Sequence, residues 1–179
     1  MKKEPKAKKC AICETEFYPL KMGQKVCSLK CSVRYAKLKT AKKEKAEKKK
    51  ELLTNKDYIK LAQNAVNAFI RLRDTGQPCI SCGKEINGVR HASHFIAAFA
   101  HSNIRFHEDN IWVSCYKCNV MLSGNQLEYR KRLIPKIGLK RVEWLENNSN
   151  IVKKYSNEEL IELIGIFKQK IKELKDGID

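Results

Sequence analysis

Apolar residues recur at helical spacing in two stretches of the chain, and they predict two long amphipathic helices. The first begins at Thr54, which forms a capping-box-like pair with Asp57, and ends near Arg73. Its apolar positions are Ile59, Ala62, Val66, Phe69, Ile70 and Leu72. The second begins at Ser156, paired with Glu159, and its stripe comprises Leu160, Leu163, Ile164, Phe167, Ile171 and Leu174. Each stripe must be buried, so we expect the two helices to pack together; a homodimer through the last helix is the alternative.

Three further helices are predicted from composition and breakers. Residues 32–50 lack Gly and Pro and are rich in Ala, Lys and Glu, which predicts a basic helix. Gly76 and Pro78 end the helix that starts at Thr54. From Gln126 onward the pattern predicts one helix, a break near residues 135–138 and a second short helix.

The charge of the chain is large and unevenly distributed. The formal net charge is +17 over 179 residues, and the first 50 residues carry 17 Lys and Arg against 5 Asp and Glu, a balance of +12. Such a basic segment predicts a polyanionic partner such as DNA, although a solvated tail would have the same composition. No run of 18 apolar residues is present, so no membrane association is expected and a cytoplasmic location is predicted.

All eight cysteines fall into close pairs, which favours metal ligands over disulfides. The first quartet is Cys10, Cys13, Cys27 and Cys31, and the second is Cys79, Cys82, Cys115 and Cys118. Two close pairs supply the four thiolates of a tetrahedral zinc site, so two structural Zn²⁺ ions are predicted. The spacing leaves open whether each quartet binds its own ion or ligands are shared. Unligated buried cysteines are the alternative, but the first segment is too short and polar to fold without a metal.

Two histidines, His91 and His94, lie in the sequence HASHF between the pairs of the second quartet. Because four thiolates already complete a tetrahedron, neither histidine is needed for zinc. Both are free for other chemistry.

The same stretch continues with RF, then Asn110, then the dipeptide formed by Cys118 and Asn119, and then the tripeptide SGN. This arrangement resembles the HNH, or ββα-metal, nuclease motif in its zinc-stapled form. More narrowly, the pattern H-A-[GS]-H-[FY], RF-x3-N, C-x2-CN-x3-SGN and YR-x2-LI-x2-IG is similar to the phage NinG or Rap recombination proteins. The resemblance covers most of the chain, including the N-terminal paired cysteines.

The resemblance implies a role for each residue of the motif. His94 would be the general base that takes a proton from the attacking water, and Asn110 would brace the loop that orients it. Asn119 would be an oxygen ligand of a catalytic Mg²⁺ or Mn²⁺. HNH enzymes commonly carry a metal ligand directly before the base, where this chain has Ser93. His91 shares a strand face with Ser93 and is expected to supply that ligand instead, which would favour Mn²⁺.

The implied function is a metal-dependent DNA endonuclease that hydrolyses phosphodiester bonds in branched recombination intermediates, such as D-loops and Holliday junctions. The expected DNA contacts are Arg105, Arg130, Arg132, Lys42, Lys43, Lys48 and Lys49. The alternative is a zinc-dependent DNA-binding or adaptor protein of recombination that cuts nothing.

The predicted fold is α+β and mostly helical, with a small zinc-stapled ββα-metal (HNH) core, an N-terminal zinc finger and flanking helices. The expected division is a finger at 1–35, a basic linker at 36–53, a helix at 54–76, the core at 77–127 and a helical region at 128–179.

Overall fold

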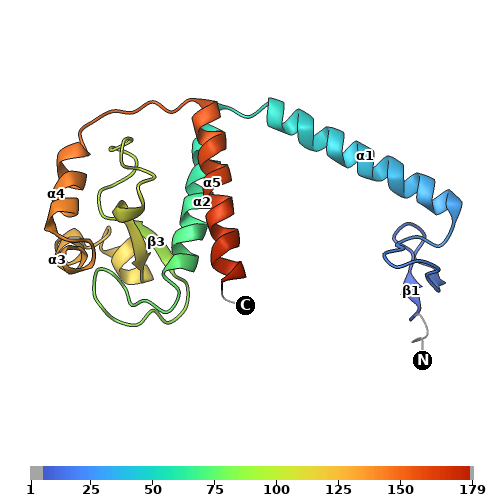
Figure 1. The fold of residues 1–179 in the computed structure, drawn as a ribbon, viewed down its shortest axis with the longest axis horizontal. Coiled ribbons are helices and arrows are strands. Elements are labelled where there is room, and N and C mark those ends of the chain that lie inside the picture. The colour runs from blue at the N-terminus through green and yellow to red at the C-terminus, as the bar shows by residue number, and fades with distance from the viewer. Residues whose placement is uncertain (1–5, 178–179) are drawn as a thin grey trace. The chain divides into compact units, whose positions relative to one another are not determined.

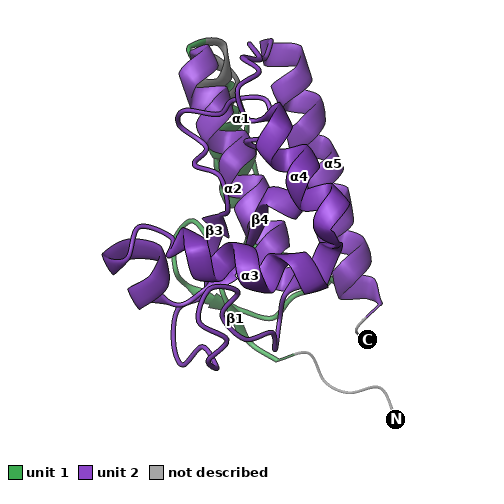
Figure 2. Ribbon diagram, turned by 90° about the vertical axis from the view of Figure 1, so that its left-hand side faces the viewer, with its two compact units in different colours: residues 1–53 green, residues 54–179 purple. Residues whose placement is uncertain are grey.

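The computed structural model describes residues 6–177, with the backbone alone described for residues 46–51. It consists of two compact units, residues 1–53 and 54–179, which are coloured separately in Figure 2. Each unit is described by itself. In the described part of the chain, no helix is long and apolar enough to cross a bilayer.

The first unit is a small hairpin followed by one long helix. Strands β1 (Lys8–Lys9) and β2 (Glu16–Phe17) pair antiparallel, and helix α1 (Leu29–Glu51) follows them. The predicted basic helix is therefore confirmed, and it begins three residues earlier than expected. Among residues 6–45, the only buried side chains are Cys10 and Cys31. This unit consequently has no apolar core among those residues.

The second unit is organised by helices α2 (Asn55–Arg73) and α5 (Asn157–Asp176), which lie side by side in Figure 1. Both predicted capping boxes are present, at Thr54 with Asp57 and at Ser156 with Glu159. The apolar stripes face each other, and the rings of Phe69 and Phe167 meet edge to face with centroids 5.3 Å apart. The packing expected within the chain is confirmed, while a homodimer stays a prediction.

A two-stranded antiparallel sheet lies against α2. Strand β3 (His91–His94) pairs with β4 (Ile111–Ser114), with His91 opposite Ser114 and His94 opposite Ile111. One face of the sheet carries Ala92, Ile111 and Val113 and joins the core formed by α2 and α5. The opposite face carries Trp112, which packs into a second core.

Short helices cover that second core. It is built largely from α3 (Gln126–Ile137) and α4 (Leu139–Asn148), the two helices expected from Gln126 onward. A 3₁₀ turn η1 (Glu108–Asn110) precedes β4, and a π-helical turn η2 (Lys117–Met121) follows it. The break expected near residues 135–138 is confirmed and falls at Gly138, while Pro135 lies inside the last turn of α3. Gly138 has φ +87°, a left-handed conformation that favours glycine and ends the helix.

A buried ion pair ties the end of α2 to the sheet. Asp74 is 2% exposed and accepts hydrogen bonds from Arg73 at 2.6 Å and from the Val113 N–H at 3.1 Å. Arg73 also donates to the Ile111 carbonyl at 3.0 Å, and its guanidinium lies 4.0 Å from the centroid of the Trp112 ring. Charged and aromatic groups thus fix β4 against α2.

The coarse fold class is confirmed: residues 6–177 are α+β and mostly helical, with two small two-stranded sheets and two four-cysteine clusters.

Candidate metal centres and histidine site

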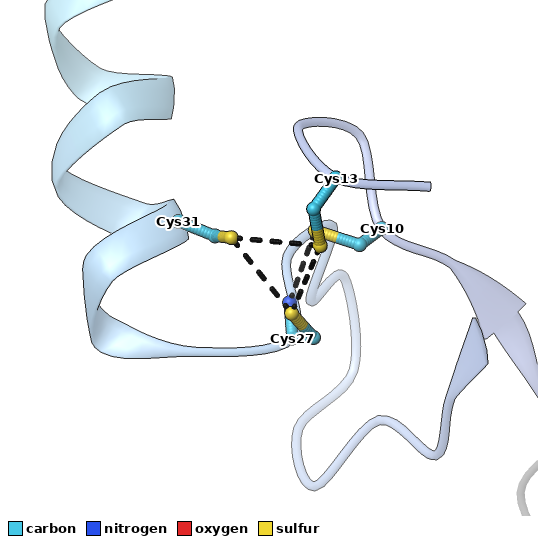
Figure 3. Close-up of side chains that lie close together, drawn as sticks. All are labelled: Cys10, Cys13, Cys27 and Cys31. Carbon is cyan, nitrogen blue, oxygen red and sulfur yellow. Dashed lines mark hydrogen bonds between the residues drawn. The ribbon is translucent and has the colours of Figure 1, made fainter. Parts of the chain in front are cut away.

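The first cysteine quartet converges at the start of α1. Cys31 lies in the first turn of that helix, and Figure 3 shows its sulfur turned toward those of Cys13 and Cys27. The Sγ atoms of Cys13 and Cys27 are 3.4 Å apart, those of Cys27 and Cys31 are 3.8 Å apart, and those of Cys31 and Cys13 are 3.7 Å apart. Zn–S bonds of about 2.3 Å give a tetrahedron with edges of about 3.8 Å. The quartet therefore fits one zinc ion.

The second quartet brings together two knuckles that are distant in the sequence. The sulfur atoms of Cys79, Cys82, Cys115 and Cys118 all lie within 4.8 Å of one another. Burial raises the pKa of the Cys79 thiol, but backbone N–H groups at Cys82, Cys115 and Ser81 outweigh it and lower that pKa to about 7. Thiolate-stabilising N–H groups are suited to a metal ligand. Each quartet is complete in itself, so each could hold its own zinc.

Gly83, directly after Cys82, has φ +71° and lies under the guanidinium of Arg132. A Cβ at this position would lie 2.5 Å from Arg132 Nη1. The positive φ favours glycine at this position, whereas the exposed guanidinium of Arg132 can move aside.

His94 ends β3 and turns its ring toward α2. Its Nε2 lies 3.0 Å from the carbonyl oxygen of Arg105. A carbonyl can only accept, so Nε2 carries the proton and Nδ1 holds the lone pair. Burial lowers the pKa of His94, the Arg105 carbonyl partly opposes this shift, and the positive charge of Arg105 adds to it. The ring is therefore neutral at pH 7, with one basic nitrogen.

Gln63 of α2 is a neighbour of His94 that the sequence analysis missed. Its Nε2 lies 3.5 Å from His94 Nε2 and 3.0 Å from Asn67 Oδ1. Its Oε1 is buried and has no partner in the described part of the chain. A half-turn of the amide would present this oxygen to the His94 N–H. The sequence feature that could have indicated this neighbour is a pair of amide side chains, at positions 63 and 67, beside the apolar stripe of α2.

Asn110 is fully buried and holds the ends of the loop that follows β3. Its Oδ1 accepts from the Ile96 N–H at 2.8 Å, and its Nδ2 donates to the carbonyls of Ile96 at 3.0 Å and Ile104 at 3.2 Å. Its own carbonyl accepts from the Phe95 N–H at 2.8 Å. These bonds place Asn110 at the base of the loop that leads from His94 to Arg105.

His91 and His94 leave β3 from opposite faces. His91 lies on the face of Ser93, as expected from strand alternation, and Ser93 is only 2% exposed. The His91 ring contacts the Tyr116 ring, with centroids 5.8 Å apart. Ser114, which pairs with His91 across the sheet, has a buried Oγ that lacks a hydrogen-bond partner among the described residues.

Asn119 lies three residues after Tyr116, in a helical turn. Its backbone N–H donates to the Cys115 carbonyl at 3.0 Å. Tyr116, whose ring contacts that of His91, directly precedes this turn. The Asn119 amide is half-buried and makes no hydrogen bond within residues 6–177.

The expected DNA-binding side chains fall into different environments. Arg130 makes two bonds to Glu146, at 2.7 and 3.1 Å, and so joins α3 to α4. Arg132 is exposed on α3, and Arg105 is half-buried beside His94. Lys42 and Lys43 are exposed on α1, whereas the side chains of Lys48 and Lys49 lie outside the described residues. DNA contact by these residues stays a prediction.

The other two histidines, His101 and His107, are half-buried and make structural contacts. His101 Nδ1 lies 2.9 Å from the Ser149 carbonyl. His107 accepts the Asp109 N–H at its Nδ1, and its ring contacts that of Trp144 with centroids 4.9 Å apart.

Comparison with known proteins places nearly the whole chain within one group of phage proteins. Residues 2–177 match the family model described as "Bacteriophage Lambda NinG protein". The chain is 35% identical to Protein ninG of Escherichia phage lambda, over 99% of this chain and 98% of that protein. It is also 35% identical to Protein ninG of Escherichia phage 933W, over 97% and 96%, and of Salmonella phage P22, over 92% and 91%. No solved structure matches the chain.

Proposed function

Because this chain belongs to the NinG family of bacteriophage proteins, we propose that it is a metal-dependent DNA endonuclease that cuts branched recombination intermediates, such as D-loops and Holliday junctions. The branch preference rests on the resemblance of its motif to the NinG or Rap recombination proteins. The observation that carries the catalytic part is the state of His94, a neutral imidazole whose Nε2–H is held by the Arg105 carbonyl at 3.0 Å. A base prepared in this way suits the activation of water.

The order of elements around His94 supports the same proposal. Strand β3, strand β4 and the helical turn η2 follow one another, and the second cysteine quartet pins both ends of this segment. In the described residues β3 pairs only with β4, so its other edge carries no strand. A phosphate lying along this edge could meet His94 from one face of the strand and His91 from the other.

The proton movements follow from the tautomer. Nδ1 of His94 accepts a proton from water as the water oxygen bonds to phosphorus and the bond from phosphorus to the 3′ oxygen breaks. The leaving oxygen takes a proton from solvent. The Arg105 carbonyl continues to accept the Nε2–H of the imidazolium, which stabilises its new charge. Arg105 lies beside the ring and is placed to pair with the phosphate.

A divalent ion would be held by Asn119 and His91. Both would be uncharged metal ligands, and neither side chain makes a hydrogen bond among residues 6–177. The anionic ligands of the ion would therefore come from the phosphate. The imidazole favours Mn²⁺ over Mg²⁺. When bound, the ion would supply charge stabilisation for the phosphate and the leaving oxygen.

The test is cleavage of labelled four-way, D-loop and linear duplex DNA by zinc-loaded protein, with Mn²⁺, Mg²⁺ or no added divalent ion. His94→Gln is the matched variant, because a glutamine amide can still donate to the Arg105 carbonyl but cannot act as a base. Divalent-dependent cuts near the branch, lost in His94→Gln with binding retained and preserved in His107→Ala, would support the proposal. Binding without cleavage under every ion would refute it and favour the DNA-binding or adaptor alternative.

A further inference from the structure

The loop of residues 96–104 connects the candidate base to its hydrogen-bond partner. It begins two residues after His94 and returns to Arg105, whose carbonyl accepts the His94 N–H. Its tip is a run of apolar residues, Ala97 to Ala100, in which Phe99 is 88% exposed. Ala97 and Ala98 are half-buried, so Phe99 and Ala100 form the exposed part of the tip, and the Phe99 ring is available to contact a ligand.

The base of this loop is held from the sheet side. Asn110 binds the Ile96 N–H and the carbonyls of Ile96 and Ile104, and Ile104 is itself fully buried. These bonds close the loop at its two ends.

The return arm of the loop is held from the segment between α4 and α5. The Tyr155 hydroxyl lies 3.3 Å from the Ser102 carbonyl, and the Ser102 hydroxyl accepts the Lys153 N–H at 2.8 Å. His101 contacts the Ser149 carbonyl, and Asn103 donates to the Asn148 carbonyl at 3.4 Å. The loop is therefore braced on both sides, and its exposed ring is presented by an ordered scaffold.

The charges near the loop favour a nucleic acid as the occupant. Arg105 stands at the end of the loop, and Lys153 and the exposed Lys154 lie in the segment that braces it. Lys153 pairs with Glu159 at 3.2 Å, whereas Lys154 has no partner within residues 6–177. An apolar tip flanked by cations matches the bases and phosphates of DNA.

We propose that the 96–104 loop is a wedge that inserts Phe99 between bases at a branch point and unstacks them. This inference rests on the proposed function, because it makes the loop the element by which that site selects branched DNA. Unstacking costs least where bases are already unpaired, and a Phe ring recovers stacking with the displaced base. A wedge of this kind would therefore favour junctions over linear duplex.

The length of the loop sets where cleavage should fall. Phe99 lies five positions after His94, so their Cα atoms are at most about 17 Å apart. At about 3.4 Å per nucleotide, the cut should lie within roughly five nucleotides of the unstacked step.

The test uses zinc-loaded full-length protein carrying His94→Gln, so that cleavage cannot obscure binding. A four-way junction with 2-aminopurine at the branch, whose fluorescence rises on unstacking, is titrated at fixed salt. Phe99→Ala should abolish the rise and weaken junction binding by about tenfold or more, with linear duplex binding unchanged. Phe99→Trp should keep both, and Ile161→Ala, an exposed apolar position on α5, should change neither.

A fluorescence rise that persists in Phe99→Ala would overturn the wedge, as would full occupancy by the parent protein without any rise. Unchanged DNA binding in Phe99→Ala would likewise overturn it and would leave the tip as a protein-docking surface. Failure of the nuclease proposal would give a different result: the fluorescence rise from unstacking would occur normally, but protein that retains His94 would not cut the DNA.

Discussion

Replacement of Asn110 by alanine should destabilise the second unit strongly, since this side chain satisfies three backbone groups at once. Its amide bonds to the Ile96 N–H, the Ile96 carbonyl and the Ile104 carbonyl at 2.8, 3.0 and 3.2 Å. At about 1 kcal/mol per bond, with a further penalty for the Ile96 N–H left without its partner, the expected loss is about 3–5 kcal/mol. That is a large share of the total stability of an ordinary domain.

Tryptophan fluorescence during urea unfolding in the presence of zinc isolates this effect. Both tryptophans, Trp112 and Trp144, lie in the second unit, so the signal does not report on the finger. Asn147→Ala is the control, because Asn147 is an exposed amide on α4. A loss below about 1 kcal/mol in Asn110→Ala would refute the argument that this amide holds the loop.

An Asn110→Asp variant tests the same geometry through pH. Its carboxylate would face the carbonyl oxygens of Ile96 and Ile104, so its folded-state pKa should rise above the unfolded value of about 3.9. The protonated form can still donate one hydrogen bond. The variant should therefore be closest to wild type at low pH and lose stability as the pH rises through the raised pKa. A stability difference from wild type that is independent of pH would contradict this.

Three further predictions concern the metal sites and the base. Cys13→Ser should reduce the zinc content from two ions to one by native mass spectrometry and unfold the finger, while the tryptophan signal of the second unit is retained. Because burial lowers the pKa of His94, the cleavage rate should stay level as the pH falls past the ordinary histidine value and drop only below it. Folding stability should begin to fall earlier, at the ordinary value where the unfolded chain protonates, and should level off below the lowered pKa of His94. A rate that falls already at the ordinary value would exclude a depressed His94 as the base. Gly83→Ala should cost about 1 kcal/mol or more because of its left-handed φ, measured by urea unfolding; a double variant with Arg132→Ala should recover little of this, because the exposed Arg132 guanidinium can move aside.

Features with short-range signals were predictable from the sequence. The two capping boxes and both apolar stripes follow from spacings of three and four residues, and the structure has them where expected. The two cysteine quartets were equally predictable, because thiols in close pairs have few uses other than a metal. The break between α3 and α4 was predicted near residues 135–138, and the structure has it at Gly138.

The partners of the candidate base were not predictable. His94 is held by the backbone carbonyl of Arg105. Because every residue has a backbone carbonyl, the sequence does not indicate which one the His94 ring would contact. Gln63 reaches the ring from a helix that lies 31 positions away in the chain. Arg130 was expected to contact DNA, yet its guanidinium is bound by Glu146 of the next helix. Side-chain identity specified the chemistry available, but only the packing of α2, the sheet and α3 against one another decided which groups meet.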